Sequence, residues 1–348
     1  MNYRKKIGLA MVAVVFVIGA SFSVYVYMAI FSPNTSFESS EVSVFIPTNT
    51  TFEDLQNVLS PHLTNSEQFF KVAKQKGYLS SVRAGKFVLT NGMNNNEIVN
   101  VLRSKPSTVA VSFNNQERLE NLAARVATQI EADSLSLVLS FKDPVFLEEN
   151  GFSLDNALSM YLPNTYDFFW NTSAEAFRDR MLNEYHRFWN DKRLTKAKKQ
   201  GLSSIEVMSL AAIVHKESVK NTERPRVAGV YLNRIKKGMK LQADPTVIYA
   251  LKKEFNNYDT IIKRVLYKDL GLDSPYNTYK QRGLPPGPIF MPDLSAIEAV
   301  LNPESHDYLY FVADTNNFGF HIFAKSLEQH NKNKLQYVSW LNKNKISR

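Results

Sequence analysis

The sequence contains no cysteine, and it lacks most of the patterns that indicate a bound ion or nucleotide. Without thiols it can form neither a disulfide nor a thiolate metal site, so the cysteine content does not distinguish an oxidising from a reducing compartment. Its histidines are scattered, with no HExxH pair, so His321 and His330 are too isolated to indicate a metal ion. The Walker pattern GxxxxGKS/T and a strand-associated GxGxxG are both absent. We therefore expect no metal and no cofactor.

The charge is positive but not concentrated. The 348 residues carry a formal net charge of +9, from 42 Lys and Arg against 33 Asp and Glu. No basic run is interleaved with aromatic residues, which argues against nucleic acid and favours a membrane surface or an acidic polymer as the partner. A hydrophobic content of 44% is sufficient to form packed cores, and the chain is longer than one ordinary domain. We expect two or three domains.

A charge-free apolar run covers residues 7–31, which is longer than the ~20 residues that span a bilayer as a helix. Basic residues at positions 4–6 precede it, so the positive-inside rule keeps segment 1–6 in the cytoplasm and places the rest outside. A cleaved signal peptide is the alternative, although its apolar region is usually ~7–15 residues. We expect a single-pass anchor in the cytoplasmic (inner) membrane, a polar linker at 32–40 and an extracytoplasmic body.

A small α+β unit follows the linker. Alternating apolar residues predict strands at 42–46 and 85–90, and polar caps before amphipathic stretches predict helices after residue 50, at 66–76 and at 95–103. Residues 109–126 then repeat the pattern of 42–59. A partial repeat of the unit and an independent use of the same strand-then-helix order both remain open, because short periodic matches are common.

The next stretch is rich in aromatic residues and then in charge. Five aromatic side chains could stack on sugar rings, but the area that each buries favours a core role: Tyr161, Tyr166, Phe168, Phe169 and Trp170. Residues 174–199 predict one long charged helix.

A carboxylate lies in the apolar stripe of the helix predicted at 205–220. The stripe, at steps of three, four and three residues, consists of Val207, Leu210, Val214 and Glu217. Burial raises the pKa of a carboxyl group, and a raised pKa suits a general acid near neutral pH. The alternative is that Glu217 lies at the edge of the stripe and pairs with Arg224 or Arg226.

Polar and rigid segments follow this helix. A second apolar helix is predicted from Val227 to a C-cap at Gly238, and Gln242 and Asp244 stand just before a third helix. Asp244 is more economically an N-cap than a catalytic residue. A proline-rich loop at 274–290 is too long for a turn and too rigid for a linker, so we expect it to shape a substrate groove. Two strands and a final helix should close the chain.

Four segments in this order resemble the YceG-like family of endolytic murein transglycosylases: IVHKES, ERPRVAGVYLNRIKKGMKLQADPTVIYAL, SPYNTYKQRGLPPGPI, and YLYFVAD with HIFAKSLEQHN. Upstream, AGKFVLTNGMNNNEIVNVLRS resembles the LysM-like domain of that family, and YLPNTYDF its YLFPDTY element. The resemblance implies an α+β protein with a LysM-like domain at 41–106 and a YceG-like catalytic region at 107–348, whose core is about 160–345. The short NNQE replaces the proline-glutamate-glycine turn that is common in relatives.

By the same resemblance the catalytic glutamate is Glu217. Relatives often have a second glutamate where this chain has His215, so Glu217 is the only carboxylate of its segment. An outline shared with soluble lytic transglycosylases matches Glu217–Ser218, Gly238–Gln242 and Tyr276–Asn277. The resemblance therefore implies these candidate substrate-binding residues: Ser218, Gln242, Asp244, Tyr276 and Asn277.

The resemblance implies cleavage of the bond between N-acetylmuramic acid and N-acetylglucosamine in peptidoglycan glycan strands, with a 1,6-anhydro product. Peptidoglycan synthases are the expected protein partners. Two alternatives stay open. One is a muramidase that hydrolyses the same bond with Glu223 or Asp244 as second carboxylate. The other is a non-catalytic, membrane-tethered scaffold that binds peptidoglycan.

Overall fold

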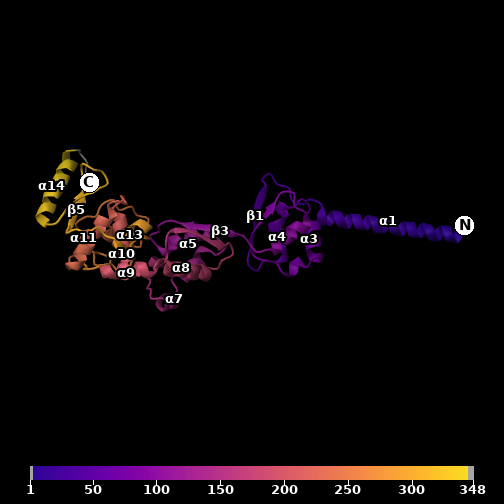
Figure 1. Ribbon diagram of the computed structural model, residues 1–348, viewed down its shortest axis with the longest axis horizontal. Helices are drawn as coiled ribbons and strands as arrows, with labels where there is room; N and C mark the ends of the chain where they lie inside the picture. Colours follow the sequence, from indigo (N-terminus) through magenta and orange to yellow (C-terminus); the bar gives the residue numbers. More distant parts are fainter. Residues whose placement is uncertain (1–2, 344–348) are drawn as a thin grey trace. The chain divides into compact units, whose positions relative to one another are not determined.

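The computed structural model describes residues 3–343 of the chain (Figure 1). The first two residues of the predicted cytoplasmic segment 1–6 and the last five of the predicted catalytic region 107–348 lie outside the described residues. The chain forms two compact units. Unit 1 comprises Met1–Val111, Thr128–Ala132 and Tyr166–Ser173, and unit 2 comprises Ser112–Ala127, Asp133–Thr165 and Ala174–Arg348. Helices together with two-stranded sheets confirm the predicted mixed α+β class.

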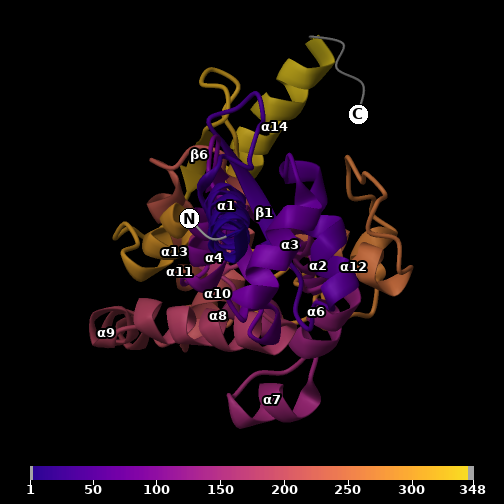
Figure 2. The ribbon, with the colours of Figure 1, turned by 90° about the vertical axis from the view of Figure 1, so that its right-hand side faces the viewer.

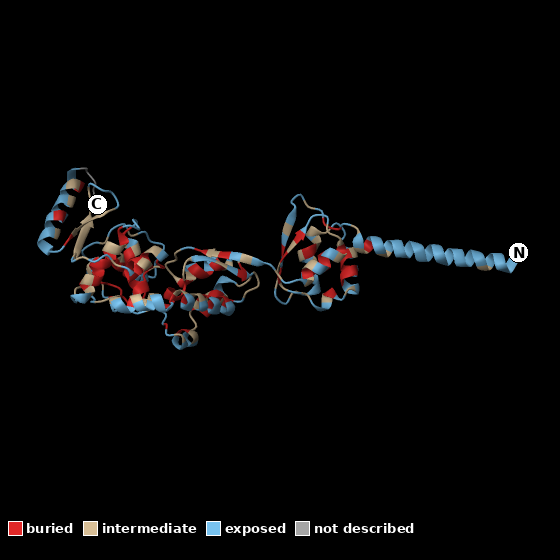
Figure 3. Ribbon diagram, in the orientation of Figure 1, coloured by how far each residue is buried: buried red, intermediate tan, exposed pale blue. Residues whose placement is uncertain are grey.

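Helix α1 (Tyr3–Phe31) presents its apolar side chains to the outside along nearly its whole length (Figure 3). It is the one helix within the described residues that is long and apolar enough, with a mean hydropathy of 2.5, to cross a membrane. The helix predicted for 7–31 is therefore present. Its last turn contacts α4 (Asn95–Arg103) within the same unit, where the Asn95 side-chain amide donates a 2.7 Å hydrogen bond to the Ala29 carbonyl.

Unit 1 contains the strands and helices that the sequence predicts for residues 41–106. Strand β1 (Glu41–Ile46) pairs antiparallel with β2 (Gly85–Thr90), and the helices are α2 (Phe52–Leu59), α3 (Ser66–Gln75) and α4 (Asn95–Arg103). Capping boxes at Thr51 and Asn94 begin α2 and α4. One apolar core joins these elements. The description of this unit as LysM-like stays a prediction.

Strand β3 (Thr108–Phe113) precedes helix α5 (Leu119–Ala127), so the predicted second strand-then-helix pair is present. β3 forms a two-stranded sheet with β4 (Asn164–Phe169), a strand from the aromatic-rich stretch. Among its aromatic residues, Tyr161 and Phe168 are buried, as a core role requires, whereas Phe169 is 37% exposed.

Unit 2 is mainly helical. Its further elements are α6 (Ser134–Phe141), α7 (Pro144–Glu149), α8 (Ala174–Phe188), α9 (Asp191–Gln200), α10 (Ser204–Glu217), α11 (Arg224–Lys236), α12 (Asp244–Glu254), α13 (Leu294–Leu301), α14 (Leu327–Lys343) and the antiparallel strands β5 (Tyr310–Ala313) and β6 (His321–Ala324). The predicted C-terminal pair of strands followed by a helix is confirmed.

The prediction of one helix over 174–199 is wrong, because this stretch forms two helices, α8 and α9, along one edge of unit 2 (Figure 2). The side chain of Asn190 accepts a hydrogen bond from the backbone N–H of Arg193 and caps α9. Trp189, directly before it, is buried. Charge periodicity continues through this break, but the cap and the buried indole end the first helix.

Helix α10 lies at the centre of unit 2, packed against α11 and α13. Every residue from Val207 to Val214 is buried (Figure 3). The predicted stripe residues Val207, Leu210 and Val214 are thus buried as expected, and the helix is in addition enclosed on its other sides, where its one polar residue in this stretch is the small Ser209. The helix also ends at Glu217 rather than at Lys220.

Candidate active site

The candidate acid is the last residue of α10. Ser203 caps the start of this helix, where its side chain accepts from the backbone N–H of Glu206. The chain leaves the helix at Ser218, whose backbone is extended, with φ −128° and ψ 122°. Glu217 thus lies at the C-terminal end, where the helix dipole disfavours an added negative charge. This position by itself makes the neutral carboxyl form easier to keep.

Glu217 faces Tyr231 of α11, whose hydroxyl donates a 3.1 Å hydrogen bond to Oε1 of Glu217. Burial raises the pKa of Glu217 from its ordinary 4.5 to about 7. The Tyr231 hydrogen bond acts in the opposite direction, as do the charges of His321 and Arg234, whereas the carboxylate of Asp244 raises this pKa further. The side chain retains a partly exposed face. A group with such a pKa exists in both protonation states near neutral pH.

The two arginines that the sequence offers as partners of Glu217 bind other carboxylates. Arg224 contacts Asp293 at 2.7 Å, and Arg226 contacts Glu304 at 3.0 Å. No ion pair within residues 3–343 includes Glu217. The predicted alternative that Glu217 pairs with Arg224 or Arg226 is therefore wrong, although Glu217 does lie at the edge of the buried stretch.

A second carboxylate, Asp244, lies close enough to Glu217 to raise its pKa. The hydroxyl of Tyr279 donates a 2.5 Å hydrogen bond to Oδ1 of Asp244. The predicted N-cap role of Asp244 is wrong, because α12 begins at Asp244 and its N-cap is Ala243, without a side-chain hydrogen bond. The carboxylate is instead exposed and turned toward Tyr279.

Gln242 precedes this carboxylate in a backbone conformation that is rare for a residue with a side chain. Its φ is 52°, in the left-handed region. Its backbone N–H donates to the carbonyl of Thr278 at 3.1 Å, which holds the loop in place. The side chain is exposed. Such strain persists only where the surroundings enforce it, and it clusters at functional sites.

The enforcing residue is Arg234, a buried cation on α11. Its Nη1 donates to the Leu241 carbonyl at 2.6 Å, and its Nε donates to the Leu309 carbonyl at 2.7 Å. Among the described residues it forms no ion pair, so its charge is offset by carbonyl dipoles and by the Tyr310 ring, whose centroid lies 5.2 Å from Cζ. Arg234 thereby fixes the Gln242 loop and lowers the pKa of Glu217.

Ser218 lies beside a second polar network. It is 1% exposed, and its Oγ donates to Oε2 of Glu223 at 3.3 Å and accepts from the Lys220 N–H at 3.2 Å. Glu223 also accepts from the backbone N–H of His321 at 2.7 Å, and its Oε2 lies 2.7 Å from the His321 ring. Burial acts to raise the pKa of Glu223, but these His321 bonds outweigh it and hold the pKa below its usual range.

Tyr276 and Asn277 hold the loop that carries Tyr279. Tyr276 is fully buried, and its hydroxyl donates to the Asp155 carbonyl at 3.1 Å. The Asn277 amide donates to the Leu272 carbonyl at 2.7 Å, and its Oδ1 accepts from the Tyr279 N–H at 3.0 Å. Both side chains are thus engaged with protein, and their role as sugar binders stays a prediction.

His215 occupies the place of the second glutamate of relatives. Its Nδ1 accepts from the backbone N–H of Asp293 at 3.1 Å, and its ring meets Phe290 edge-on. Burial lowers the pKa of His215. The imidazole therefore serves as a neutral acceptor that joins α10 to the start of α13.

The structure brings Glu217, Gln242 and Asp244 toward one centre and adds residues that the sequence analysis did not select as site residues. In the sequence, Tyr231 is one of the apolar positions of the helix predicted from Val227, and His321 is a histidine too isolated to indicate a metal ion. Tyr279 and Arg234 lie within the family-like segments, but nothing in the sequence marks them apart from their neighbours there. No cluster of three or more histidines and carboxylates that could hold a metal ion occurs within residues 3–343.

Comparisons with known proteins extend over both units. The profile of the YceG-like family matches residues 44–336, which include every candidate residue above. A Bacillus subtilis protein named endolytic murein transglycosylase is 32% identical over 330 residues, which cover 89% of each chain. A Streptococcus pneumoniae protein of the same name is 35% identical over 177 residues, which cover 51% of this chain and 31% of that one.

A solved structure is similar as well. A yceG-like protein from Listeria monocytogenes matches with a TM-score of 0.54 and 30% sequence identity, over 84% of this chain and 98% of that one. The likeness therefore holds in both sequence and fold.

Proposed function

The chain belongs to the YceG-like family, and we propose that it is a lytic transglycosylase that cleaves the glycan strands of peptidoglycan. The observation that carries the proposal is Glu217, a carboxyl with a pKa of about 7 in the segment that matches the family. Because the relatives are named as endolytic enzymes, we extend the proposal to cleavage within strands, which would limit strand length.

The scissile bond in this proposal is the β-1,4 link from N-acetylmuramic acid to N-acetylglucosamine. Protonated Glu217 gives its proton to the linking oxygen, and the C1–O bond breaks through an oxocarbenium-like state. The resulting carboxylate then accepts the proton of the muramyl 6-hydroxyl, whose oxygen closes onto C1. The product is a 1,6-anhydro end, no water is consumed, and Glu217 ends in its starting protonation state.

The Tyr231 hydrogen bond assigns the two oxygens of Glu217 different tasks. Since Oε1 accepts from Tyr231 at 3.1 Å, Oε2 is the oxygen left to carry the transferable proton. One carboxylate suffices because the nucleophile belongs to the substrate, and proximity replaces an activated water. Asp244 adds to the effect of burial, which is the main cause of the raised pKa of Glu217, and with Gln242 it is a candidate contact for the sugar.

A muramidase is the second candidate, since Asp244 is an exposed carboxylate in the same site. Glu223 is the weaker choice for a base, because it is 4% exposed and both of its oxygens accept hydrogen bonds from His321. Mass spectrometry of the products separates the two reactions. A transglycosylase releases ends lighter by one water than the reducing ends that a hydrolase leaves.

The deciding experiment digests purified peptidoglycan with the full-length chain in detergent. Fragments of many disaccharides that each carry an anhydro end support the endolytic transglycosylase, and release of single anhydro disaccharides from strand ends contradicts the endolytic part. Binding of strands without release of fragments would instead support the non-catalytic tethered scaffold.

We further propose that α1 anchors the chain in the cytoplasmic membrane with residues 1–6 inside. Its support is the apolar surface of the helix and the basic residues at 4–6. This location would place the site where glycan strands are polymerised, so peptidoglycan synthases are the proposed partners.

A further inference from the structure

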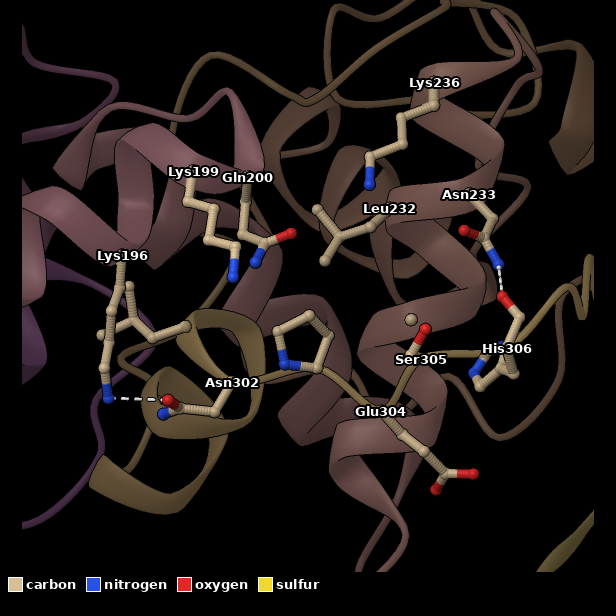
Figure 4. Close-up of a pocket in the computed structure, with 13 residues that line it drawn as sticks. Lys196, Lys199, Gln200, Leu232, Asn233, Lys236, Asn302, Glu304, Ser305 and His306 are labelled. Atoms are coloured by element: carbon tan, nitrogen blue, oxygen red, sulfur yellow. Dashed lines mark hydrogen bonds between the residues drawn. The ribbon is translucent and has the colours of Figure 1, made fainter.

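A cavity of about 400 Å³ opens in unit 2 between α9, α11 and the segment that follows α13 (Figure 4). α9 contributes Lys196, Lys199 and Gln200, and α11 contributes Lys236, among others. The side chains of Lys199 and Lys236 extend into the space between the two helices. The cavity is therefore lined by cations from two separate elements.

These cations are not neutralised by neighbouring carboxylates. Glu304 is the one carboxylate among the lining residues, and both of its oxygens contact Arg226 at 3.0 Å. Lys196 donates to Oδ1 of Asn302 at 2.6 Å, which is a neutral acceptor. Within residues 3–343, no ion pair includes Lys199 or Lys236. Ammonium groups that share a concave site without counter-charge raise the local potential and favour an anion.

The wall of the cavity formed by Glu304, Ser305 and His306 packs closely against α11. A Cβ at Gly229 would lie 2.6 Å from Nε2 of His306 and 2.7 Å from the Glu304 carbonyl, so only glycine allows this approach. The Asn233 amide donates to the His306 carbonyl at 2.7 Å, a bond drawn in Figure 4. The cavity is thus a preformed shape rather than a gap between mobile loops.

The cavity is separate from the candidate active site. Gly229, Leu232 and Lys236 line it from one face of α11. Tyr231 and Arg234, which face Glu217 and the Gln242 loop, lie on the opposite face of the same helix, because successive residues are about 100° apart.

We propose that this cavity binds a phosphate-bearing ligand. Ammonium groups bind phosphate as point charges, and lysines from two helices can contact different oxygens of one tetrahedral group. Citrate tests the carboxylate alternative below. The amide of Gln200 and the hydroxyl of Ser305 supply neutral hydrogen-bond donors at the same site. The phosphate can belong to a diphosphate or to a phosphodiester, and the two sources are distinguished by the probes below.

The test titrates pyrophosphate, glycerophosphoglycerol and citrate separately into the full-length chain in a neutral detergent, followed by calorimetry. The double variant Lys199→Gln/Lys236→Gln removes the two unpaired cations. Each hydrogen bond to a charged group is worth about a factor of ten in affinity, so at least a tenfold weaker binding of the phosphate probe is expected. The matched control, Lys198→Gln/Lys237→Gln, removes the same charge from adjacent exposed positions outside the cavity and should bind as the unchanged protein does.

Pyrophosphate binding without glycerophosphoglycerol binding assigns a diphosphate, and the reverse assigns a phosphodiester. Equal losses in both double variants would mean that only the overall charge matters and would overturn the proposal, as would tighter binding of citrate or no binding of either phosphate. The proposal is independent of the catalytic one, so Glu217→Gln should leave phosphate binding unchanged.

Discussion

The hydroxyl of Tyr231 donates a 3.1 Å hydrogen bond to Oε1 of Glu217, joining the last residue of α10 to the middle of α11. This contact stabilises the ionised carboxylate, whereas burial stabilises the neutral acid. The balance leaves the pKa at about 7, and it can be displaced in either direction by single substitutions.

Glu217→Gln should lower cleavage by about 10²–10⁴-fold, since the variant cannot transfer a proton. The amide has nearly the shape of the acid, so circular dichroism and strand binding should remain those of the unchanged protein. The measurement is the rate of fragment release from purified peptidoglycan. Cleavage at an unchanged rate would falsify the role of Glu217 as the acid.

Tyr231→Phe removes the hydroxyl that stabilises the ionised form of Glu217. The pKa of Glu217 should then rise, so the acid stays protonated to higher pH. In a profile of kcat/KM against pH, the limb on which activity declines with rising pH should move to higher pH. A limb that stays in place would show that Tyr231 does not act on the ionisation of this acid.

Asp244→Asn should move the same limb in the opposite direction. The Asp244 carboxylate raises the pKa of Glu217, so its removal lowers that pKa and leaves less acid protonated at neutral pH. A transglycosylase should regain activity at lower pH. Complete loss of activity at every pH, together with reducing ends in the products of the unchanged protein, would instead identify Asp244 as the base of a hydrolase.

The raised pKa of Glu217 also predicts how stability depends on pH. The unfolded chain ionises this group near 4.5 and the folded chain near 7, so the folded state loses stability as pH rises through this window. Glu217→Gln should therefore raise the free energy of unfolding at pH 8 by about 2 kcal/mol, after allowance for screening at the exposed face. At pH 4 the difference should vanish. Urea unfolding at both pH values measures it, and an equal effect at both would contradict the pKa assignment.

Gln242→Gly separates strain from substrate contact. Relief of the left-handed backbone at φ 52° should stabilise the fold by up to about 1 kcal/mol, while loss of the side chain should raise KM. Gly201→Ala is the matched control, because Gly201 has φ 76° and ends α9, so alanine should cost about 1 kcal/mol and leave KM unchanged. An unchanged KM for Gln242→Gly would remove this side chain from the proposed sugar site.

Local chemistry predicts most of the elements. The capping box at Asn94 and the alternation in residues 85–90 give α4 and β2 their bounds, because caps and alternation act over a few residues. The break at Asn190 escaped prediction because the charged pattern on either side of it is continuous, and only the packing of Trp189 and the cap reveal it.

The position of Glu217 in a helix of apolar residues, and the order of the quoted segments, are properties of the sequence alone. They are enough to select one acid and one family, since both depend on residue types and spacing along the chain. The surroundings of that acid cannot be predicted from the sequence alone. They consist of burial, the hydroxyl of Tyr231 and the charges of Asp244, Arg234 and His321, which come from other segments of the chain. Only their convergence in the folded chain sets the pKa of Glu217, as electrostatic interactions depend on distance in space.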